Sequence, residues 1–252
     1  MTTRLAWLGH STVVLDVDGA RVLTDPLLQA HNGILRRMTP PPRRDQWADP
    51  DAVLISHLHH DHAELSSLRM VNGAPTVTAP ANADFLRGKG IRGATGLVAD
   101  DWLEVAPGVE VRLVRAIHGH RPMPHRPNAA NGHLLRTSAM VVWFAGDTSL
   151  YDEIAVLADL AEQPVDLAVV PIGGWGARLS GGHMGPREAA EACRLVGAKQ
   201  ALAVHYGTLT VPAMSRFPRG WMQRPGGFDL ALADLAPGCE RIRLAPSESV
   251  TL

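Results

Sequence analysis

The stretch Ala52-Val53-Leu54-Ile55-Ser56-His57-Leu58-His59-His60-Asp61-His62 decides the architecture expected for this chain. Its first part, residues 52–56, is a short continuous apolar run of the kind found in strands that are covered on both faces. Four histidines and an aspartate follow within six residues, at the carboxyl end of that strand. A polar loop whose histidines cap the strand is the simplest alternative, but this density of imidazoles favours a metal site.

The spacing inside the run is suited to two cations. In an extended or looping segment His57 and His59 point the same way and can grip one cation, while Asp61 and His62 can reach a neighbouring one. The run therefore predicts half of a two-metal site.

The other half is expected at the ends of later strands, because metal ligands need rigid support. Three further apolar runs, at residues 109–117, 140–145 and 201–204, each end within two residues of a suitable side chain: His118, Asp147 and His205. Each of these alone could be an ordinary polar residue that caps a strand. Together they complete a plausible ligand set.

Length and composition set the broad class. A chain of 252 residues can bury a sizeable core, and we expect a single domain over residues 1–252. With 24 Lys and Arg against 25 Asp and Glu, the formal net charge of -1 disfavours nucleic acid or an anionic membrane as a partner. No stretch approaches the roughly twenty apolar residues of a membrane span, and the N-terminus does not resemble a signal peptide, so we expect a cytoplasmic location. Cys193 and Cys239 stand in unrelated contexts and are expected to be reduced and structural.

Strands predominate early and then alternate with helices. Apolar runs at residues 5–8, 12–17 and 20–24 predict a β-meander, with Asp18-Gly19 as a tight turn. The Pro-rich basic stretch 38–44 is expected to be a surface excursion. Later strands are predicted at 76–79, 109–117, 140–145, 167–171 and 201–204, and helices at 81–87, 151–160 and 186–196. This order favours sheets flanked by helices.

Several motifs make the chain resemble a known superfamily. The HxHxDH run, a later His, Gly146-Asp147-Thr148 and a strand-end His resemble the metallo-β-lactamase superfamily. A narrower resemblance points to the branch containing L-ascorbate 6-phosphate lactonase and N-acylphosphatidylethanolamine phospholipase D. It rests on Trp7-Leu8-Gly9-His10-Ser11-Thr12, Leu23-Thr24-Asp25-Pro26, Ile55-Ser56-His57, Pro171-Ile172-Gly173-Gly174, His183-Met184 and His205-Tyr206-Gly207-Thr208. The resemblance implies an α/β fold of the αββα type, a four-layer sandwich of two mixed β-sheets with helices on the outer faces.

The resemblance also assigns the ligands. It places three residues on the first metal, three on the second and one between them: His57, His59 and His118; Asp61, His62 and His205; and the bridging Asp147. His120 lies two residues beyond His118 and can face the same side, but we favour His118. His60 occupies the variable position of the run and is expected to point away from the metals.

Three further residues receive roles from the resemblance, each beside a simpler structural explanation, and Trp175 is considered because it follows a buried-type strand. His10 and Asp25 would orient imidazoles, although ordinary turn chemistry also explains them. His183 would donate a hydrogen bond to a developing oxyanion, or would merely precede a helix. Trp175 could line the pocket or pack in the core. The remaining histidines are expected on the surface or in loops: His31, His125 and His133.

Two divalent cations held in this way would lower the pKa of a bridging water and supply hydroxide as the nucleophile. Asp61 would orient the hydroxide or take its proton. Zn²⁺ is the preferred ion, with Mn²⁺, Fe²⁺ and Ni²⁺ as alternatives. We expect a small-molecule substrate with a phosphodiester first, then a lactone or other cyclic ester or amide, then a β-lactam. Arg121 or Arg126 could grip a phosphate, or be solvated loop residues.

Other classes of protein are less compatible with the sequence. By the resemblance, a diiron redox protein of this fold would carry a carboxylate where His59 stands and would need a flavin-binding partner domain. A non-catalytic metal-binding or regulatory module has the same ligand set and stays open. Nucleic-acid processing is disfavoured by the neutral charge. Residues 209–252 carry no recognisable chemistry and are expected to complete the fold.

Overall fold

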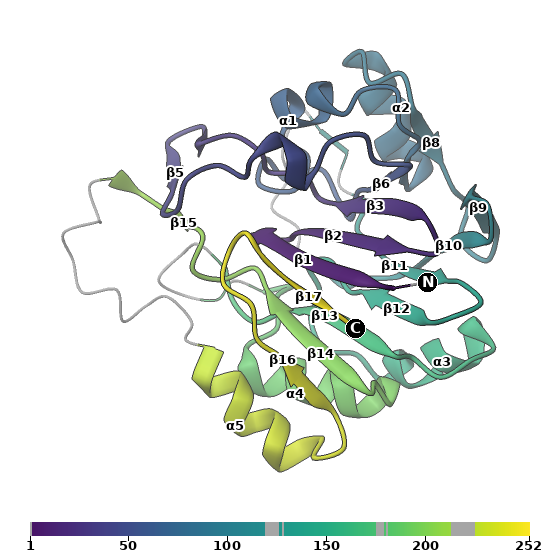
Figure 1. The fold of residues 1–252 in the computed structure, drawn as a ribbon, viewed down its shortest axis with the longest axis vertical. Coiled ribbons are helices and arrows are strands. Elements are labelled where there is room, and N and C mark those ends of the chain that lie inside the picture. Colours follow the sequence, from purple (N-terminus) through teal and green to yellow (C-terminus); the bar gives the residue numbers. More distant parts are fainter. Residues whose placement is uncertain (1, 119–125, 128, 175–178, 180, 213–224) are drawn as a thin grey trace.

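The computed structural model describes residues 2–118, 126–127, 129–174, 179, 181–212 and 225–252 of the chain. Two seven-stranded sheets pack face to face, and helices cover the outer face of each (Figure 1). Each sheet contains both parallel and antiparallel pairs. The predicted α/β sandwich of two mixed sheets with helices outermost is therefore confirmed.

The first sheet is built on the predicted meander. In spatial order it contains β17 (Glu248–Thr251), β1 (Arg4–Gly9), β2 (Thr12–Val17), β3 (Ala20–Thr24), β6 (Ala52–Leu54), β7 (Thr76–Thr78) and β8 (Ala94–Gly96). Asp18 and Gly19 both have positive φ angles, of 49° and 86°, which match the turn to the twist of its flanking strands. From β3 onward the strands are parallel, so β6 delivers its carboxyl end to the same edge as β3.

The second sheet brings three more strand ends to one edge. Its strands are, in order, β16 (Glu240–Ile242), β14 (Gln200–Val204), β13 (Leu167–Pro171), β12 (Val141–Phe144), β11 (Asn131–Arg136), β10 (Val109–Arg115) and β9 (Trp102–Ala106). Strands β12, β13, β14 and β16 are parallel, and β10 runs in their direction because β11 is antiparallel to both β10 and β12. The carboxyl ends of β10, β12 and β14 therefore lie on one side of the molecule.

A small third sheet covers this side. It consists of β15 (Leu209–Thr210), β5 (Leu35–Arg37) and β4 (His31–Asn32). The basic stretch that follows β5 runs over the surface to the short 3-10 helix η1 (Arg44–Gln46), as predicted for residues 38–44. Leu209 and Thr210 thus join the N-terminal part of the fold through β5.

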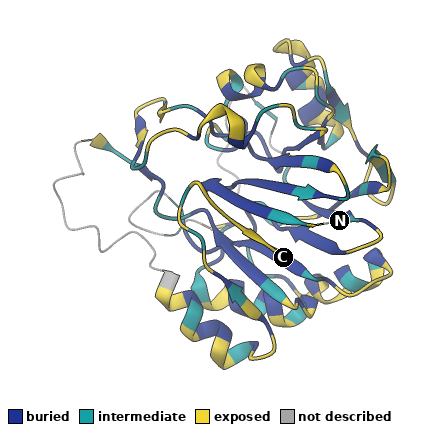
Figure 2. Ribbon diagram, in the orientation of Figure 1, coloured by how far each residue is buried: buried dark blue, intermediate teal, exposed yellow. Residues whose placement is uncertain are grey.

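Three apolar layers hold the sandwich together, and burial follows them (Figure 2). The middle layer lies between the sheets and includes Trp7, Phe144 and Val169. The outer layers lie beneath the helices: α1 (Leu65–Met70) and α2 (Pro80–Gly88) on the first sheet, and η2 (Asp152–Val156), α3 (Leu157–Ala161), α4 (Pro186–Val196) and α5 (Pro225–Leu235) on the second. Because sheet and helix residues interdigitate on both sides, the strand ends are held rigidly.

Helix α4 shows why this arrangement forms. Its buried residues, mostly alanines, lie on one face, and their small side chains allow the helix to approach the sheet closely. Pro186 opens it without the loss of an intrahelical hydrogen bond, and Gly197 ends it in the left-handed conformation with φ 67°. The predicted bounds 186–196 agree with the structure.

Some expectations need correction. His133, expected on the surface or in a loop, is buried in β11, because that strand is covered on both faces. The helix expected over 151–160 is divided into the 3-10 helix η2 and the five-residue α3. Cys193, on α4, and Cys239 are buried free thiols of one core cluster, which agrees with the expectation that they are reduced and structural. Among the described residues, no helix combines the length and apolarity needed to cross a bilayer.

Candidate metal centre

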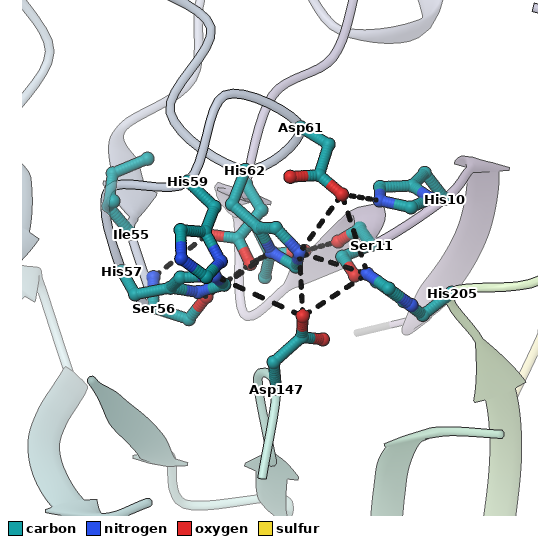
Figure 3. Close-up of polar contacts among 12 residues, drawn as sticks. His10, Ser11, Ile55, Ser56, His57, His59, Asp61, His62, Asp147 and His205 are labelled. Atoms are coloured by element: carbon teal, nitrogen blue, oxygen red, sulfur yellow. Dashed lines mark hydrogen bonds and ion pairs between the residues drawn. The ribbon is translucent and has the colours of Figure 1, made fainter. Parts of the chain in front are cut away.

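The histidine run forms a tight loop immediately after β6. The amides of His62 and Ala63 both donate to the carbonyl of His59, at 3.1 and 2.8 Å. This turn directs the side chains of His57, His59, Asp61 and His62 toward a common region, as Figure 3 shows. His60 is exposed and belongs to none of the metal-compatible clusters among the described residues.

The first cluster joins both sheets. His57 and His59 come from the loop after β6, and His118 lies three residues beyond the end of β10. His118 Nε2 lies 3.0 Å from His59 Nδ1. The ring centroid of His57 lies 4.5 Å from that of His59 and 4.6 Å from that of His118. On its other side His118 Nδ1 is 2.8 Å from the carbonyl of Gly182, which orients the ring.

The second cluster consists of Asp61, His62, His205 and His10. His205 follows β14, and its Nε2 lies 3.1 Å from His62 Nε2. Its Nδ1 lies 2.9 Å from the carbonyl of Gly173. His10 follows β1 and places Nε2 3.0 Å from Asp61 Oδ2. The histidine run therefore meets side chains from both sheets here as well.

Asp147 lies between the two clusters (Figure 3). Its Oδ2 is 3.2 Å from Nε2 of His62, His183 and His205, and 3.9 Å from Nε2 of His57. Gly146 precedes it with a φ of 62°, a conformation that glycine adopts without strain. An added Cβ on Gly146 would lie 2.7 Å from Ser56 Cβ, so the close approach of the two sheets requires this glycine.

Asp25 supports the loop from behind. Its carboxylate accepts hydrogen bonds from the amide and hydroxyl of Ser56, at 2.8 and 2.7 Å, and lies 2.8 Å from His62 Nδ1. Ser56 Oγ is also 3.0 Å from His57 Nδ1. One buried carboxylate thus fixes the backbone before the histidine run and the orientation of His62.

The electrostatics separate the residues into neutral and charged groups. Burial lowers the pKa of His57 well below its ordinary value, and burial lowers the pKa of His59 to about 4. Burial would also lower the pKa of His62, but the Asp147 and Asp25 carboxylates hold it well above the ordinary value. Although burial alone would raise the pKa of Asp147, His205 and His62 hold it well below its usual range. His57 and His59 are therefore unprotonated and Asp147 is ionised, which are the forms that bind metals, whereas His62 carries a proton that a bound metal would displace.

The donor atoms fit divalent cations. His57 Nε2 and Asp147 Oδ1 are buried and have no hydrogen-bond partner in the part of the chain that the structure describes. The close nitrogen pairs, His59 with His118 and His62 with His205, are 3.0 and 3.1 Å apart. Two imidazole nitrogens bound to one tetrahedral Zn²⁺ at about 2.0–2.1 Å would stand roughly 3.3 Å from each other. Imidazole nitrogens and carboxylate oxygens converge here as a metal site requires.

The structure brings together most of the residues that the sequence singled out. Three of them contact the clusters through polar atoms: His10 contacts Asp61, Asp25 contacts His62, and His183 contacts Asp147. Others lie outside the described residues: His120, Arg121, His125 and Trp175. His31 is exposed on β4, whereas His133 is buried.

Two residues have supporting roles that the sequence did not predict. Arg126, considered either as a phosphate ligand or as a solvated loop residue, donates hydrogen bonds to the carbonyls of Leu58 and Ala63. Asn82, on α2, bonds to the backbone of Ala129 through both atoms of its amide. Neither contact follows from a motif, because each joins segments that are far apart in the sequence.

Comparison with known proteins identifies the fold and the family. The beta-lactamase superfamily domain matches residues 20–206. A UPF0173 metal-dependent hydrolase from Methanopyrus kandleri is 30% identical over 93% of this chain and 97% of its own length. Among solved structures, the metallo hydrolase Igni18 from Ignicoccus hospitalis has a TM-score of 0.77 at 23% identity, covering 100% of this chain and 99% of its own. An isothiocyanate hydrolase from Delia radicum gut bacteria has a TM-score of 0.73 at 18% identity, covering 98% of both chains.

The sandwich is thus that of the metallo-β-lactamase fold. The chain belongs to the beta-lactamase superfamily and, within it, to the UPF0173 family of metal-dependent hydrolases.

Proposed function

We propose that this protein is a dinuclear metal-dependent hydrolase that cleaves an ester bond in a small molecule, with a phosphodiester as the preferred substrate. The position of Asp147 carries the proposal. Its carboxylate contacts residues of both clusters, with Oδ2 3.2 Å from His62 Nε2 and 3.9 Å from His57 Nε2. A single-metal site would not need a buried carboxylate between two separate groups of ligands.

In this proposal the first metal is held by His57, His59 and His118, and the second by Asp61, His62 and His205. Asp147 is shared between them. His118 is preferred to His120 because its Nε2 faces His59 at 3.0 Å. Imidazole and carboxylate ligands suit Zn²⁺, although Mn²⁺, Fe²⁺ and Ni²⁺ accept the same atoms.

When bound, two divalent cations supply Lewis acidity and make a water acidic enough to be deprotonated near neutral pH. Asp61 is placed to accept a proton or a hydrogen bond from the attacking water, because Asp61 Oδ2 projects into the second cluster at 3.8 Å from His205 Nε2. His10 Nε2 lies 3.0 Å from the same oxygen and fixes the direction of the carboxylate. Burial opposes ionisation of Asp61, but His10 and His62 keep its pKa well below the usual range, so it stays an acceptor.

His183 is proposed to stabilise the reaction's developing charge. Its side chain is 14% exposed, and its Nε2 lies 3.2 Å from Asp147 Oδ2, so it stands at the rim of the centre. From there an N–H can donate to an oxyanion on the substrate. The chemistry suits either a phosphoryl or a carbonyl oxygen.

The substrate class rests on the motifs shared with the branch of L-ascorbate 6-phosphate lactonase and N-acylphosphatidylethanolamine phospholipase D. We place phosphodiesters first and lactones second within that branch's range of chemistry. We propose accordingly that the protein is a soluble enzyme of the cytoplasm and acts on a small molecule.

Metal content and hydrolysis, measured on one set of variants, test the proposal. The matched pair is His59→Ala and His60→Ala, because these neighbours in one loop differ in whether they face the cluster. We expect about two metals per chain in the wild type and in His60→Ala, with turnover of bis-(p-nitrophenyl) phosphate. His59→Ala should lose metal and about 100-fold or more in kcat/KM.

Three outcomes would change the assignment. Equal behaviour of the two variants would refute the ligand set. Turnover of lactones without any turnover of phosphodiesters would replace the substrate class. Two bound metals without hydrolysis of either ester class would favour a non-catalytic metal-binding module.

A further inference from the structure

Arg126 reaches the backbone of the histidine loop from outside the metal centre. Its Nη1 donates to the carbonyl of Leu58 and to the carbonyl of Ala63, each at 3.0 Å. These two residues flank the four-residue turn 59–62, which supplies three of the proposed ligands. One guanidinium nitrogen therefore ties the beginning of the turn to its end.

The charge of Arg126 is directed to these carbonyls. Its hydrogen bonds within the described residues go to these two carbonyls, whereas the nearby Glu64 carboxylate caps α1 by accepting from the amides of Ser66 and Ser67. Burial lowers the pKa of Arg126, and Glu64 only partly offsets this shift. Hydrogen bonds from a charged donor are stronger than neutral ones, so the two carbonyls are held firmly.

The guanidinium is also fixed from its other face. It lies over the ring of Phe85 on α2, with 5.5 Å between the guanidinium carbon and the ring centroid. Packing against an aromatic ring limits the orientations of the guanidinium plane. Arg126 is therefore held by α2 on one side and bonded to the loop on the other.

The chain that follows Arg126 is anchored as well. Asn82 Nδ2 donates to the carbonyl of Ala129 at 2.7 Å, and Asn82 Oδ1 accepts from the Ala129 amide at 3.3 Å. The amide of Asn131 then donates to the carbonyl of Ser56 at 2.9 Å. The guanidinium is thus carried by backbone that is bonded both to α2 and to the strand before the histidine run.

We propose that Arg126 is a positioning residue that holds the turn 59–62 in the conformation in which His59, Asp61 and His62 face the metals. The role rests on the proposed function only in that these side chains are metal ligands. Two backbone hydrogen bonds hold the turn, from the amides of His62 and Ala63 to the carbonyl of His59. Arg126 adds a hydrogen bond at each end of the turn, to the carbonyls of Leu58 and Ala63. Without the guanidinium the carbonyls of Leu58 and Ala63 lose a shared donor, and the turn opens more often.

The test compares Arg126→Gln and Arg126→Lys with Arg69→Gln. Arg69 is an exposed arginine in the last turn of α1, seven residues beyond His62, and serves as the control. Hydrogen exchange of the His62 and Ala63 amides is measured in the whole protein after chelation. Affinity for Zn²⁺ is then measured by competition with a chromophoric chelator.

In Arg126→Gln we expect about tenfold faster exchange of these two amides and a 10- to 100-fold weaker affinity for Zn²⁺. Arg126→Lys keeps a charged donor and should lie between this variant and the wild type. It also serves as the test variant if Arg126→Gln does not fold. Arg69→Gln should match the wild type in both measurements.

Exchange in the Arg126 variants equal to that of Arg69→Gln would overturn the proposal. Faster exchange with unchanged affinity for Zn²⁺ would also overturn it, because the turn would then not need the clamp to bind metal. A wild-type protein that binds no divalent metal would refute the proposed function instead. In that case the exchange comparison alone decides whether Arg126 holds the turn.

Discussion

Three imidazoles of the centre, those of His62, His118 and His205, are oriented through the ring nitrogen that faces away from it. His62 Nδ1 meets Asp25, and the Nδ1 atoms of His118 and His205 meet the carbonyls of Gly182 and Gly173. In a neutral imidazole, a proton held at Nδ1 leaves the lone pair on Nε2. A proton on Nδ1 of His118 and His205 would be held by these backbone carbonyls, which would leave each Nε2 available to the proposed metal.

His133 provides a residue-scale prediction about acid stability. It is fully buried, accepts from Asn131 Nδ2 at Nε2 with a separation of 3.2 Å, and has a pKa that burial lowers to about 4. Between pH 6.5 and about 4 the unfolded chain binds this proton and the folded chain does not, so stability is lost as the pH falls through that window. From pH 7 to pH 5 the loss from this one residue is about 2 kcal/mol.

His133→Gln removes the titration but keeps an acceptor for Asn131. The free energy of unfolding is measured in urea, with chelator, at pH 7 and at pH 5. We expect the decrease from pH 7 to pH 5 to be about 2 kcal/mol smaller in His133→Gln than in the wild type. His31→Gln, which changes an exposed histidine on β4, should fall as the wild type does. An identical pH dependence for His133→Gln and the wild type would show that His133 is not held neutral.

At the scale of elements, the sequence predicts those strands and helices whose burial pattern is simple. The strands β2, β3 and β13 and the helix α4 have the predicted bounds, because their apolar runs end at turn residues or at a helix cap. Strand β11 is missed because Asn131 and Gly132 resemble a turn and His133 interrupts the apolar pattern. Its residues are buried by neighbouring strands that the local sequence does not specify.

The same distinction applies to the candidate site. His118, Asp147 and His205 are predictable because each follows an apolar strand, and the carboxyl ends of β10, β12 and β14 meet at one edge. Asn82 and Arg126 are not predictable, since their partners are backbone atoms 47 and more than 60 residues away. The candidate ligands can be found in the sequence, whereas the contacts that support them depend on how distant segments pack.

Gly146 links the strand β12 to Asp147, and its replacement gives an element-scale prediction. Gly146 and Gly197 have nearly equal φ angles, of 62° and 67°, so alanine strains the backbone similarly at both, by roughly 1–2 kcal/mol. Only at Gly146 would the new Cβ also meet other atoms, 2.7 Å from Ser56 Cβ and 3.0 Å from the Asn131 carbonyl. An added Cβ on Gly197 would have no atom of the surrounding structure within 4 Å.

We therefore expect Gly146→Ala to lose about 1–3 kcal/mol more stability than Gly197→Ala, because the first sheet must shift away from the second. Asp147 directly follows Gly146 on the second sheet and would be displaced from His57 and His62 of the first, so Zn²⁺ affinity should fall about tenfold or more in Gly146→Ala alone. Urea unfolding and chelator competition measure the two effects. Wild-type affinity for Zn²⁺ in Gly146→Ala would contradict the role given to this turn.

On the scale of the whole molecule, the centre lies where the two sheets meet. The loop after β6 belongs to the first sheet, while the chain after β10, β12 and β14 belongs to the second. Each proposed metal would have ligands from both sheets, because His57 and His59 face His118, and His62 faces His205. Bound metals would then connect the sheets at one edge, in addition to the apolar layer between them.

Removal of the metals should consequently lower the stability of the whole fold. A ligand that binds only the folded state at about 1,000 times its Kd contributes about 4 kcal/mol, and in a chain of this size that corresponds to a shift in Tm of roughly 10 °C. We expect a chelator to lower the Tm by that order, and added Zn²⁺ to restore it. His60→Ala should respond as the wild type does, whereas Asp147→Ala should respond much less, because it lacks the carboxylate that both clusters contact. If circular dichroism gave the same Tm with and without chelator in the wild type, the metals would not join the sheets, and the apolar layer alone would hold them together.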